Sequence, residues 1–213
     1  MSRGRALALV VAAVAVIAAC SAPSAVSPSG DCNGDTRTAG TFPDLEGQVP
    51  TALGGKQATR HDSGRSCTSK ALGSLASHGV SELRFAGSTW DEGSGNATTI
   101  AVFETAPGSP PLAAAWVQEF YETGARNSSK TDNITTSKPA IDGVGEAWRL
   151  DVLNDLSYQS IVVWSVGSVV HVVLVATQVR PDASMDTHNA RVAAALAAGV
   201  AGPGASLGAA QSQ

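Results

Sequence analysis

The chain has 213 residues, of which 43% are hydrophobic and 15% are charged, and its formal net charge at pH 7 is −4. This composition excludes an intrinsically disordered protein, and the length suffices for one domain with a sizeable hydrophobic core. The acidic balance argues against nucleic acid as a partner, because nucleic-acid binding requires a basic surface.

The N-terminal segment is typical of a secretory signal. Two basic residues, Arg3 and Arg5, precede an uncharged apolar run at 6–19. This run is shorter than the about 20 apolar residues that a membrane-spanning helix needs. A basic start, a short apolar segment and small residues at its end predict a cleaved signal peptide over residues 1–19.

The sequence Ile17-Ala18-Ala19-Cys20 resembles the lipobox of bacterial lipoproteins, in which an aliphatic and two small residues precede an acylated cysteine. The resemblance implies that Cys20 carries a diacylglycerol group and a fatty acid such as palmitate and becomes the mature N-terminus. The mature chain would have a net charge of −6, since Arg3 and Arg5 are removed. We therefore expect covalent rather than electrostatic attachment to the extracytoplasmic face of the cell membrane. An ordinary secretory peptide that ends in Ala-Ala-Cys is the alternative.

The cysteine count agrees with export from the cytoplasm. The chain has three cysteines, and assigning Cys20 to lipid leaves Cys32 and Cys67, with no C-x-x-C motif. A disulfide between Cys32 and Cys67 is the prediction for an oxidising compartment. A redox-active or metal-binding pair is the alternative.

Composition divides the mature chain into three parts. Residues 20–31 are rich in serine, alanine and proline and are expected to be a lipidated tether. Residues 32–197 are expected to form a single domain. Residues 198–213 consist mainly of alanine, glycine, serine and glutamine and are predicted to be a disordered tail.

The first half of the domain is predicted to contain two helices and three strands. Each helix ends at a glycine, and the expected ranges are 43–53 and 68–77 for the helices and 56–61, 80–85 and 98–105 for the strands. The polar, glycine-rich segment 88–96 is expected to be a loop that leaves Trp90 exposed as a contact residue.

The second half is predicted to contain a helix, four strands and a final helix. The first helix begins at Ser109-Pro110-Pro111 and presents a ridge of Leu112, Trp116 and Phe120. The four strands are expected at 134–138, 146–153, 158–166 and 169–178. The final helix is expected to start near Asp182 or Ser184, with Met185, Val192, Leu196 and Val200 facing inward.

The last two strands are expected to pair as a hairpin. The dipeptide Gly167-Ser168 suits a two-residue turn. In the resulting register Trp164 faces His171 and Val162 faces Val173. Trp164 and His171 could therefore line the mouth of a pocket, although a core tryptophan beside a hydrogen-bonded histidine is the simpler interpretation.

The order of elements predicts an α+β fold: a single domain with an antiparallel sheet and helices packed mainly on one face. The residues Asp44-Leu45-Glu46, Pro50 and Leu53-Gly54-Gly55 resemble uncharacterised secreted lipoproteins of high-GC bacteria. The order of elements is also similar to PsbP-like domains. Neither resemblance implies catalytic residues.

No motif predicts a catalytic, metal or cofactor site. His61-Asp62-Ser63 contains the residue types of a hydrolase triad, but neighbouring residues on a strand point to opposite faces. The histidines are scattered without ligand spacing, so neither a metal ion nor a cofactor is expected.

Two functions are consistent with these patterns. The first is a non-catalytic binding or interaction module, whose partner would be a small apolar ligand or an envelope protein. Its binding surface would be an open sheet face or a groove under the helix at 112–120. The second is a small cell-envelope hydrolase with a site assembled from distant residues, such as His171 with Asp151 or Glu146. The lack of a catalytic motif favours the binding module.

Overall fold

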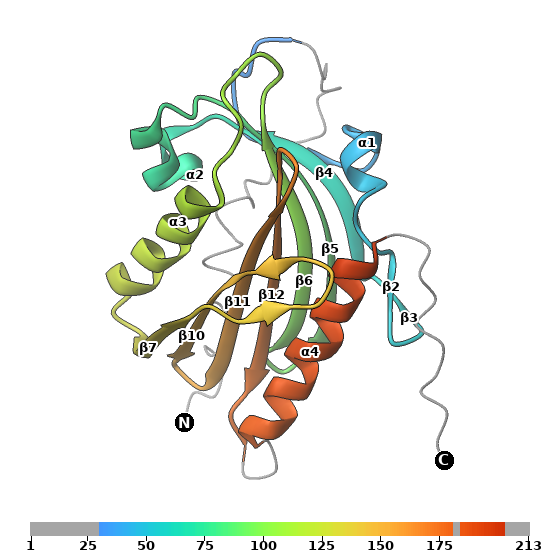
Figure 1. Ribbon diagram of the computed structural model, residues 1–213, viewed down its shortest axis with the longest axis vertical. Coiled ribbons are helices and arrows are strands. Elements are labelled where there is room, and N and C mark those ends of the chain that lie inside the picture. Colours follow the sequence, from blue (N-terminus) through green and yellow to red (C-terminus); the bar gives the residue numbers. More distant parts are fainter. Residues whose placement is uncertain (1–29, 181–183, 203–213) are drawn as a thin grey trace, which may run out of the picture.

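The computed structural model describes residues 30–180 and 184–202. The signal peptide, Cys20, most of the tether and the tail from residue 203 lie outside these ranges. The described residues form one compact α+β body built on an eight-stranded antiparallel sheet, in the order β1-β4-β5-β6-β12-β11-β10-β7 (Figure 1). The strands are β1 (Thr36–Thr38), β4 (Arg60–Ser66), β5 (Leu83–Gly93), β6 (Asn96–Thr105), β7 (Thr131–Ser137), β10 (Trp148–Asn154), β11 (Ser157–Val166) and β12 (Val169–Gln178).

The remaining elements are short hairpins and helices. The hairpins are β2 (Ala52–Leu53) with β3 (Lys56–Gln57), and β8 (Ala140–Ile141) with β9 (Gly145–Glu146). The helices are α1 (Pro43–Glu46), α2 (Ser69–Leu72), a 3-10 helix at Gly73–His78, α3 (Ala114–Asn127) and α4 (Met185–Ala201). Strand residues therefore outnumber helical residues.

The β11–β12 hairpin has the predicted turn and register. Trp164 pairs with His171 and Val162 with Val173. Gly167 has a φ of 60°, which the two-residue turn requires and which glycine adopts without strain. The predicted pairing of these two central strands is therefore confirmed. It was predictable because their sequence is apolar on both faces and contains one clear turn signal.

The predicted loop at 88–96 is wrong. β5 continues to Gly93 and β6 begins at Asn96, so only Ser94 and Gly95 form the turn, with φ values of 53° and 79°. Trp90 is consequently a strand residue with 4% of its surface exposed. Polar residues in this stretch pair with β6 through backbone groups, which composition alone does not reveal.

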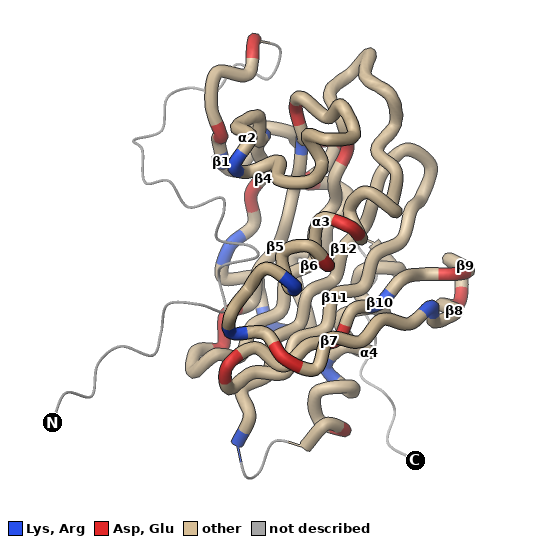
Figure 2. Tube along the Cα trace, turned by 90° about the vertical axis from the view of Figure 1, so that its left-hand side faces the viewer, with Lys and Arg blue, Asp and Glu red and all other residues tan. Residues whose placement is uncertain are grey.

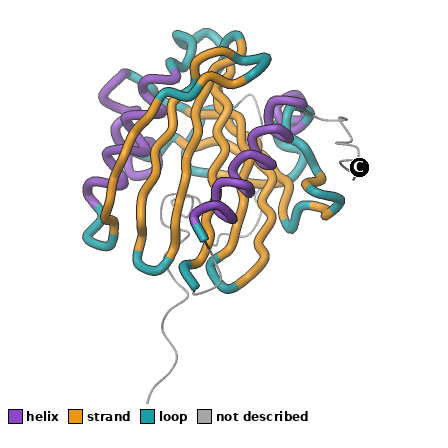
Figure 3. The backbone as a smooth tube through the Cα atoms, turned by 60° about the horizontal axis from the view of Figure 1, so that its bottom comes forward, coloured by secondary structure: helices purple, strands orange, loops and turns teal. Residues whose placement is uncertain are grey.

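The expectation of helices mainly on one face is also wrong. Val162 packs in the core cluster that contains Val192 and Ala195 of α4, whereas Val163 packs in the cluster that contains Val117 and Tyr121 of α3. Adjacent strand residues point to opposite faces, so α3 and α4 cover opposite sides of the sheet. Figure 3 shows α4 lying across the strands, with the other large helix beyond the opposite side.

Helix α4 begins where one of the predictions placed it. Ser184 is the N-cap and its hydroxyl accepts a hydrogen bond from the Thr187 amide at 3.2 Å. Val192 faces inward as expected, but Met185 is 47% exposed. The helix continues to Ala201 and buries Ala198, so the ordered domain extends past the predicted boundary at residue 197.

Two other predicted helices differ from the structure. The helix at 43–53 is reduced to the four residues of α1, after which Gly54 and Gly55, with φ of 56° and 78°, form the β2–β3 turn. The helix from 68 is confirmed at its start, where the Thr68 hydroxyl caps α2, but it tightens into a 3-10 helix from Gly73.

A disulfide fastens the N-terminal arm, residues 30–38, to the end of β4. It joins Cys32 to Cys67, which are 35 residues apart in the sequence. Beside it, the Asp35 carboxylate accepts hydrogen bonds from the Cys67 amide at 2.9 Å and the Thr68 hydroxyl at 2.6 Å. Covalent and polar contacts thus hold the arm at one place.

Arg65 and Gly64 hold the same arm against the body of the sheet. The Arg65 guanidinium donates hydrogen bonds to the carbonyl oxygens of Gly30 and Asp31. A Cβ at Gly64 would overlap the carbonyl oxygen of Thr36, so only glycine allows β1 to pair this closely with β4.

We expect Cys32→Ser to lower the free energy of unfolding by about 4 kcal/mol, because the 35-residue loop is no longer closed in the unfolded chain. Urea denaturation of the oxidised wild-type chain and the variant measures this difference. Reduction of the wild-type chain should reproduce the effect. Equal midpoints for oxidised wild type and Cys32→Ser would contradict the prediction.

Candidate functional site

A buried polar network joins the first turns of α4 to three strands of the sheet. The His188 ring contacts the Ser160 hydroxyl through Nε2 at 2.8 Å and the Thr177 hydroxyl through Nδ1 at 2.9 Å. Ser160 also donates a hydrogen bond to Asp151 Oδ1. The exposed fractions are 0% for Ser160, 1% for His188 and 3% for Thr177, so these three residues are closed to solvent.

Arg149 completes the network on its more exposed side. Its Nε donates to Asp151 Oδ1 at 2.9 Å, and one terminal nitrogen donates to Asn189 Oδ1 at 2.8 Å and to Ser160 at 3.2 Å. Arg149 and Asp151 lie on β10, Ser160 on β11 and Asn189 on α4. Two strands and the helix are therefore linked through one guanidinium group.

The hydrogen-bond donors assign the tautomer of His188. Ser160 has one proton and gives it to Asp151, so His188 Nε2 must donate to Ser160. In the neutral ring Nδ1 is then unprotonated and accepts a hydrogen bond from the Thr177 hydroxyl. Neutral imidazole with its proton on Nε2 satisfies every contact of the ring.

This network contains serine, histidine and aspartate but lacks the hydrogen-bond arrangement of a catalytic triad. A triad requires the serine proton to point at histidine and the carboxylate to bind the opposite ring nitrogen. Here the serine proton points at Asp151, and the opposite ring nitrogen contacts Thr177. Because Ser160 is also fully buried, a substrate has no access to it. The network therefore holds α4 on the sheet rather than performing acyl transfer.

Burial sets the ionisation of His188. Desolvation by burial lowers its pKa from the usual 6.5 to about 4, and the positive charge of Arg149 acts in the same direction. Asp151 opposes this shift and Arg191 adds to it. The ring is thus neutral near pH 7, and the tautomer with its proton on Nε2 satisfies both of its contacts.

The sequence-predicted site residues are distributed differently. Trp164 and His171 stack with ring centroids 5.3 Å apart, as their pairing predicts, and burial lowers the pKa of His171. Within the described residues, no carboxylate forms a hydrogen bond with His171, so the expected pairing with Asp151 or Glu146 is not formed. Trp90 is not an exposed contact residue, since it is buried and its indole donates to the Lys56 carbonyl oxygen at 3.0 Å.

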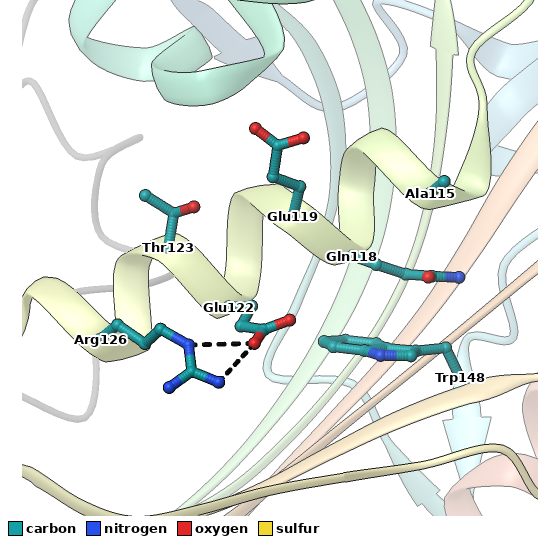
Figure 4. Close-up of a pocket in the computed structure, with 7 residues that line it drawn as sticks. All are labelled: Ala115, Gln118, Glu119, Glu122, Thr123, Arg126 and Trp148. Atoms are coloured by element: carbon teal, nitrogen blue, oxygen red, sulfur yellow. Dashed lines mark hydrogen bonds and ion pairs between the residues drawn. The ribbon is translucent and has the colours of Figure 1, made fainter.

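A surface cavity of about 320 Å³ lies beside α3 on the opposite face of the sheet. Figure 4 shows Gln118 and Glu122 projecting from the helix toward Trp148, with Arg126 beside Glu122. Glu119 and Thr123 project toward the other side of the helix in the same view. The complete lining is Ala115, Gln118, Glu119, Glu122, Thr123, Arg126 and Trp148.

A second cavity of about 230 Å³ adjoins the first, because Gln118 and Trp148 line both. Its outer wall contains Lys138 and Glu146, which form an ion pair at 3.2 Å beside the β8–β9 hairpin. Figure 2 shows blue and red segments next to each other at this hairpin. The complete lining is Ala114, Gln118, Lys138, Glu146, Ala147, Trp148, Val163, Trp164 and Ser165. We call the two cavities together the α3 groove.

Sequence reasoning missed both the network and the main groove residues. His188 lies four residues before Val192 and on the same face of α4, but a histidine was not expected to face the core. Gln118 and Trp148 come from an amphipathic helix and an alternating strand, and no local pattern shows that they meet. Ser160 and Thr177, as polar residues inside apolar strands, were the available signal for the network.

Across residues 30–180 and 184–202, no group of three or more histidine, cysteine, aspartate or glutamate residues is arranged to hold a metal ion. In the same ranges, no helix combines the length and the apolar character required to cross a membrane.

Searches with the chain match no protein-family model, no curated protein and no solved structure. The resemblances to secreted lipoproteins and to PsbP-like domains therefore stay predictions.

We expect His188→Gln to reduce the acid sensitivity of folding. In the wild-type chain, the free energy of unfolding falls as the pH falls from 6.5 toward 4. In this range His188 binds a proton in the unfolded chain but stays neutral in the folded one. Each pH unit in this window lowers the free energy of unfolding by at most about 1.4 kcal/mol. Urea denaturation at pH 7, 6 and 5 measures the slope for both chains.

Glutamine suits this test because its amide can donate to Ser160 and accept from Thr177. Part of the slope should remain in the variant, since burial also lowers the pKa of His171. Parallel profiles for wild type and His188→Gln would show that His188 is not the buried neutral group.

Proposed function

We propose that this protein is an extracytoplasmic lipoprotein, anchored to the cell membrane through Cys20, that acts as a non-catalytic binding module. The observation that carries the proposal is the sequence Ile17-Ala18-Ala19-Cys20 after a basic and apolar leader. Cleavage before Cys20 would leave a short tether between the lipid and the domain. A flexible linker of about ten residues has an end-to-end distance of about 18 Å, so the domain would lie near the membrane.

The way in which the domain holds its N-terminal arm supports this proposal. The chain enters the described body at Gly30, where Arg65 binds the backbone and the disulfide follows at Cys32. A lipid anchor would transmit any pull on the protein to this point. A covalent link to β4 prevents the arm from peeling away under such a load.

The α3 groove supports a binding function rather than hydrolysis. It lies beside the helix under which a groove was expected, and its lining includes exposed polar side chains. The serine, histidine and aspartate that the fold brings together are instead buried in the α4 network. The lining is mainly polar, so a polar ligand fits it better than the small apolar ligand expected from the sequence.

The anchor is tested by the mass of the N-terminal peptide of protein purified from membranes. We expect the wild-type chain to begin at Cys20 with the added mass of a diacylglycerol and a fatty acid, and Cys20→Ser to lack that mass. Cys32→Ser is the matched control and should keep the lipid. A wild-type chain that retains residues 1–19, or begins at an unmodified Cys20, would contradict the proposal.

A further inference from the structure

We propose that the α3 groove binds a neutral carbohydrate, in the form of a short oligosaccharide. This inference rests on the proposed function as a binding module and gives that module a ligand class. It depends on three properties of the groove: balanced charge, an uncommitted amide and an aromatic floor.

The charged side chains that face the groove occur in neutral pairs. Glu122 binds Arg126 at 2.6 Å, and Glu146 binds Lys138 at 3.2 Å. Glu119 is directed to the other side of α3, where its carboxylate contacts His78 Nε2 at 2.8 Å (Figure 4). Glu122 and Glu146 therefore each have a cationic partner, so these two pairs offer no surplus charge to attract an ion. This balance favours an uncharged ligand.

The same pairs present hydrogen-bonding groups that suit hydroxyls. Carboxylates accept hydrogen bonds, and guanidinium and ammonium groups donate them. A sugar hydroxyl both donates and accepts, so neighbouring hydroxyls can bridge the two members of an ion pair. These pairs are largely exposed, with side-chain exposures of 59% for Arg126 and 68% for Lys138 and Glu146, and such surface pairs rearrange at little cost.

Gln118 is the residue best placed to form hydrogen bonds with such a ligand. It lines both cavities, and its side chain forms no hydrogen bond with any other residue of the described chain. Its amide therefore keeps two donor hydrogens and an acceptor oxygen for a ligand. A polyol satisfies donors and acceptors together, whereas an apolar ligand would leave them unpaired and cut off from water.

Trp148 provides the aromatic floor. It is 7% exposed, and its packing in the hydrophobic core on the α3 side of the sheet fixes its position. Figure 4 shows the indole below Gln118 and Glu122. A sugar ring seated on the indole requires Gln118 to turn aside, and this rotation breaks no hydrogen bond within the described chain. The apolar C–H face of the sugar then packs on the ring while its hydroxyls meet Gln118 and the ion pairs.

The size and shape of the groove favour a short oligosaccharide. The two cavities, of about 320 and 230 Å³, share Gln118 and Trp148 in their linings. Ligand sites are about 300–1,000 Å³, so the second cavity alone is too small for one, the first is at the lower limit, and the two together are of ordinary size. One sugar unit in each cavity, with the linkage beside Gln118, uses both.

The test is a titration of the full mature protein, held in a detergent without a sugar head group. Maltotriose, cellotriose and chitotriose are the neutral probes, and trigalacturonic acid is the charged comparison. Tryptophan fluorescence and calorimetry report binding. We expect saturable binding of at least one neutral trisaccharide and no stronger binding of the charged one.

Variants locate the site. Gln118→Ala should weaken binding at least tenfold, because it removes the only uncommitted amide that both cavities share. Trp148→Phe should weaken binding while keeping an aromatic core residue, with the fold checked by circular dichroism. Asn127→Ala is the matched control, because Asn127 ends α3, is exposed and does not line either cavity.

Three outcomes would overturn the inference. They are the failure of every neutral trisaccharide to bind, preference for the charged one, and unchanged affinity in Gln118→Ala. The mass of the N-terminal peptide tests the membrane anchor independently, so a lipid on Cys20 without saccharide binding would reject only the ligand class.

Discussion

The structure depends on a central β-hairpin that is apolar on both faces. Residues 160–164 of β11 and 172–176 of β12 are buried without interruption. A sheet with two apolar faces must be covered on both sides, since leaving one valine or isoleucine side chain exposed forgoes about 1.5–3 kcal/mol. Helices α3 and α4 therefore occupy opposite faces, and each face contributes its own core. The α3 groove and the buried network are consequences of these two helix–sheet interfaces.

The two helix–sheet interfaces differ in whether their polar side chains are buried or exposed to solvent. Under α4 the helix approaches so closely that Gly199 lies where a Cβ would contact Trp164 at 3.2 Å. Polar groups in that interface are sealed from water, so His188, Ser160 and Thr177 must satisfy one another. Along α3, in contrast, Gln118 and Arg126 remain in contact with solvent. A dissolved molecule can therefore reach these polar groups on the α3 side, whereas those under α4 are closed to it.

The sequence was sufficient where a pattern is local and continuous. Gly167-Ser168 lies between two apolar strands, and from it the register of Trp164 with His171 could be predicted. The start of the last helix could be narrowed to Asp182 or Ser184, of which Ser184 is the cap, and the disulfide could be predicted, because each has a residue-specific physical requirement. The strand at 88–93 could not be predicted, because its polar residues pair with β6 through their backbone groups and their side chains give no sign of it.

The placement of the helices on both faces was not predicted either, because an apolar strand indicates burial but does not show which elements provide it. Residues such as Gln118 and Trp148 meet only through the fold, and their spacing of thirty residues contains no signal. Arg149 shows the same limit: its partners come from β10, β11 and α4. Local patterns therefore predicted elements, whereas sites made by distant residues required the structure.

The α3 groove exists because the neighbouring strands β10 and β11 do not end at the same level of the sheet. β10 pairs with β11 only as far as Trp148 with Val163, while β11 continues to Val166. Before Trp148 the chain leaves the sheet for the β8–β9 hairpin, so Ser165 has no neighbour from β10 and the space beside it opens toward Ala114 of α3. A strand that ended in step with β11 would fill this space with side chains. The early departure of β10 thus leaves a recess beside the end of β11, with Trp148 as its floor, and the proposed binding of a ligand on this side of the molecule depends on that recess.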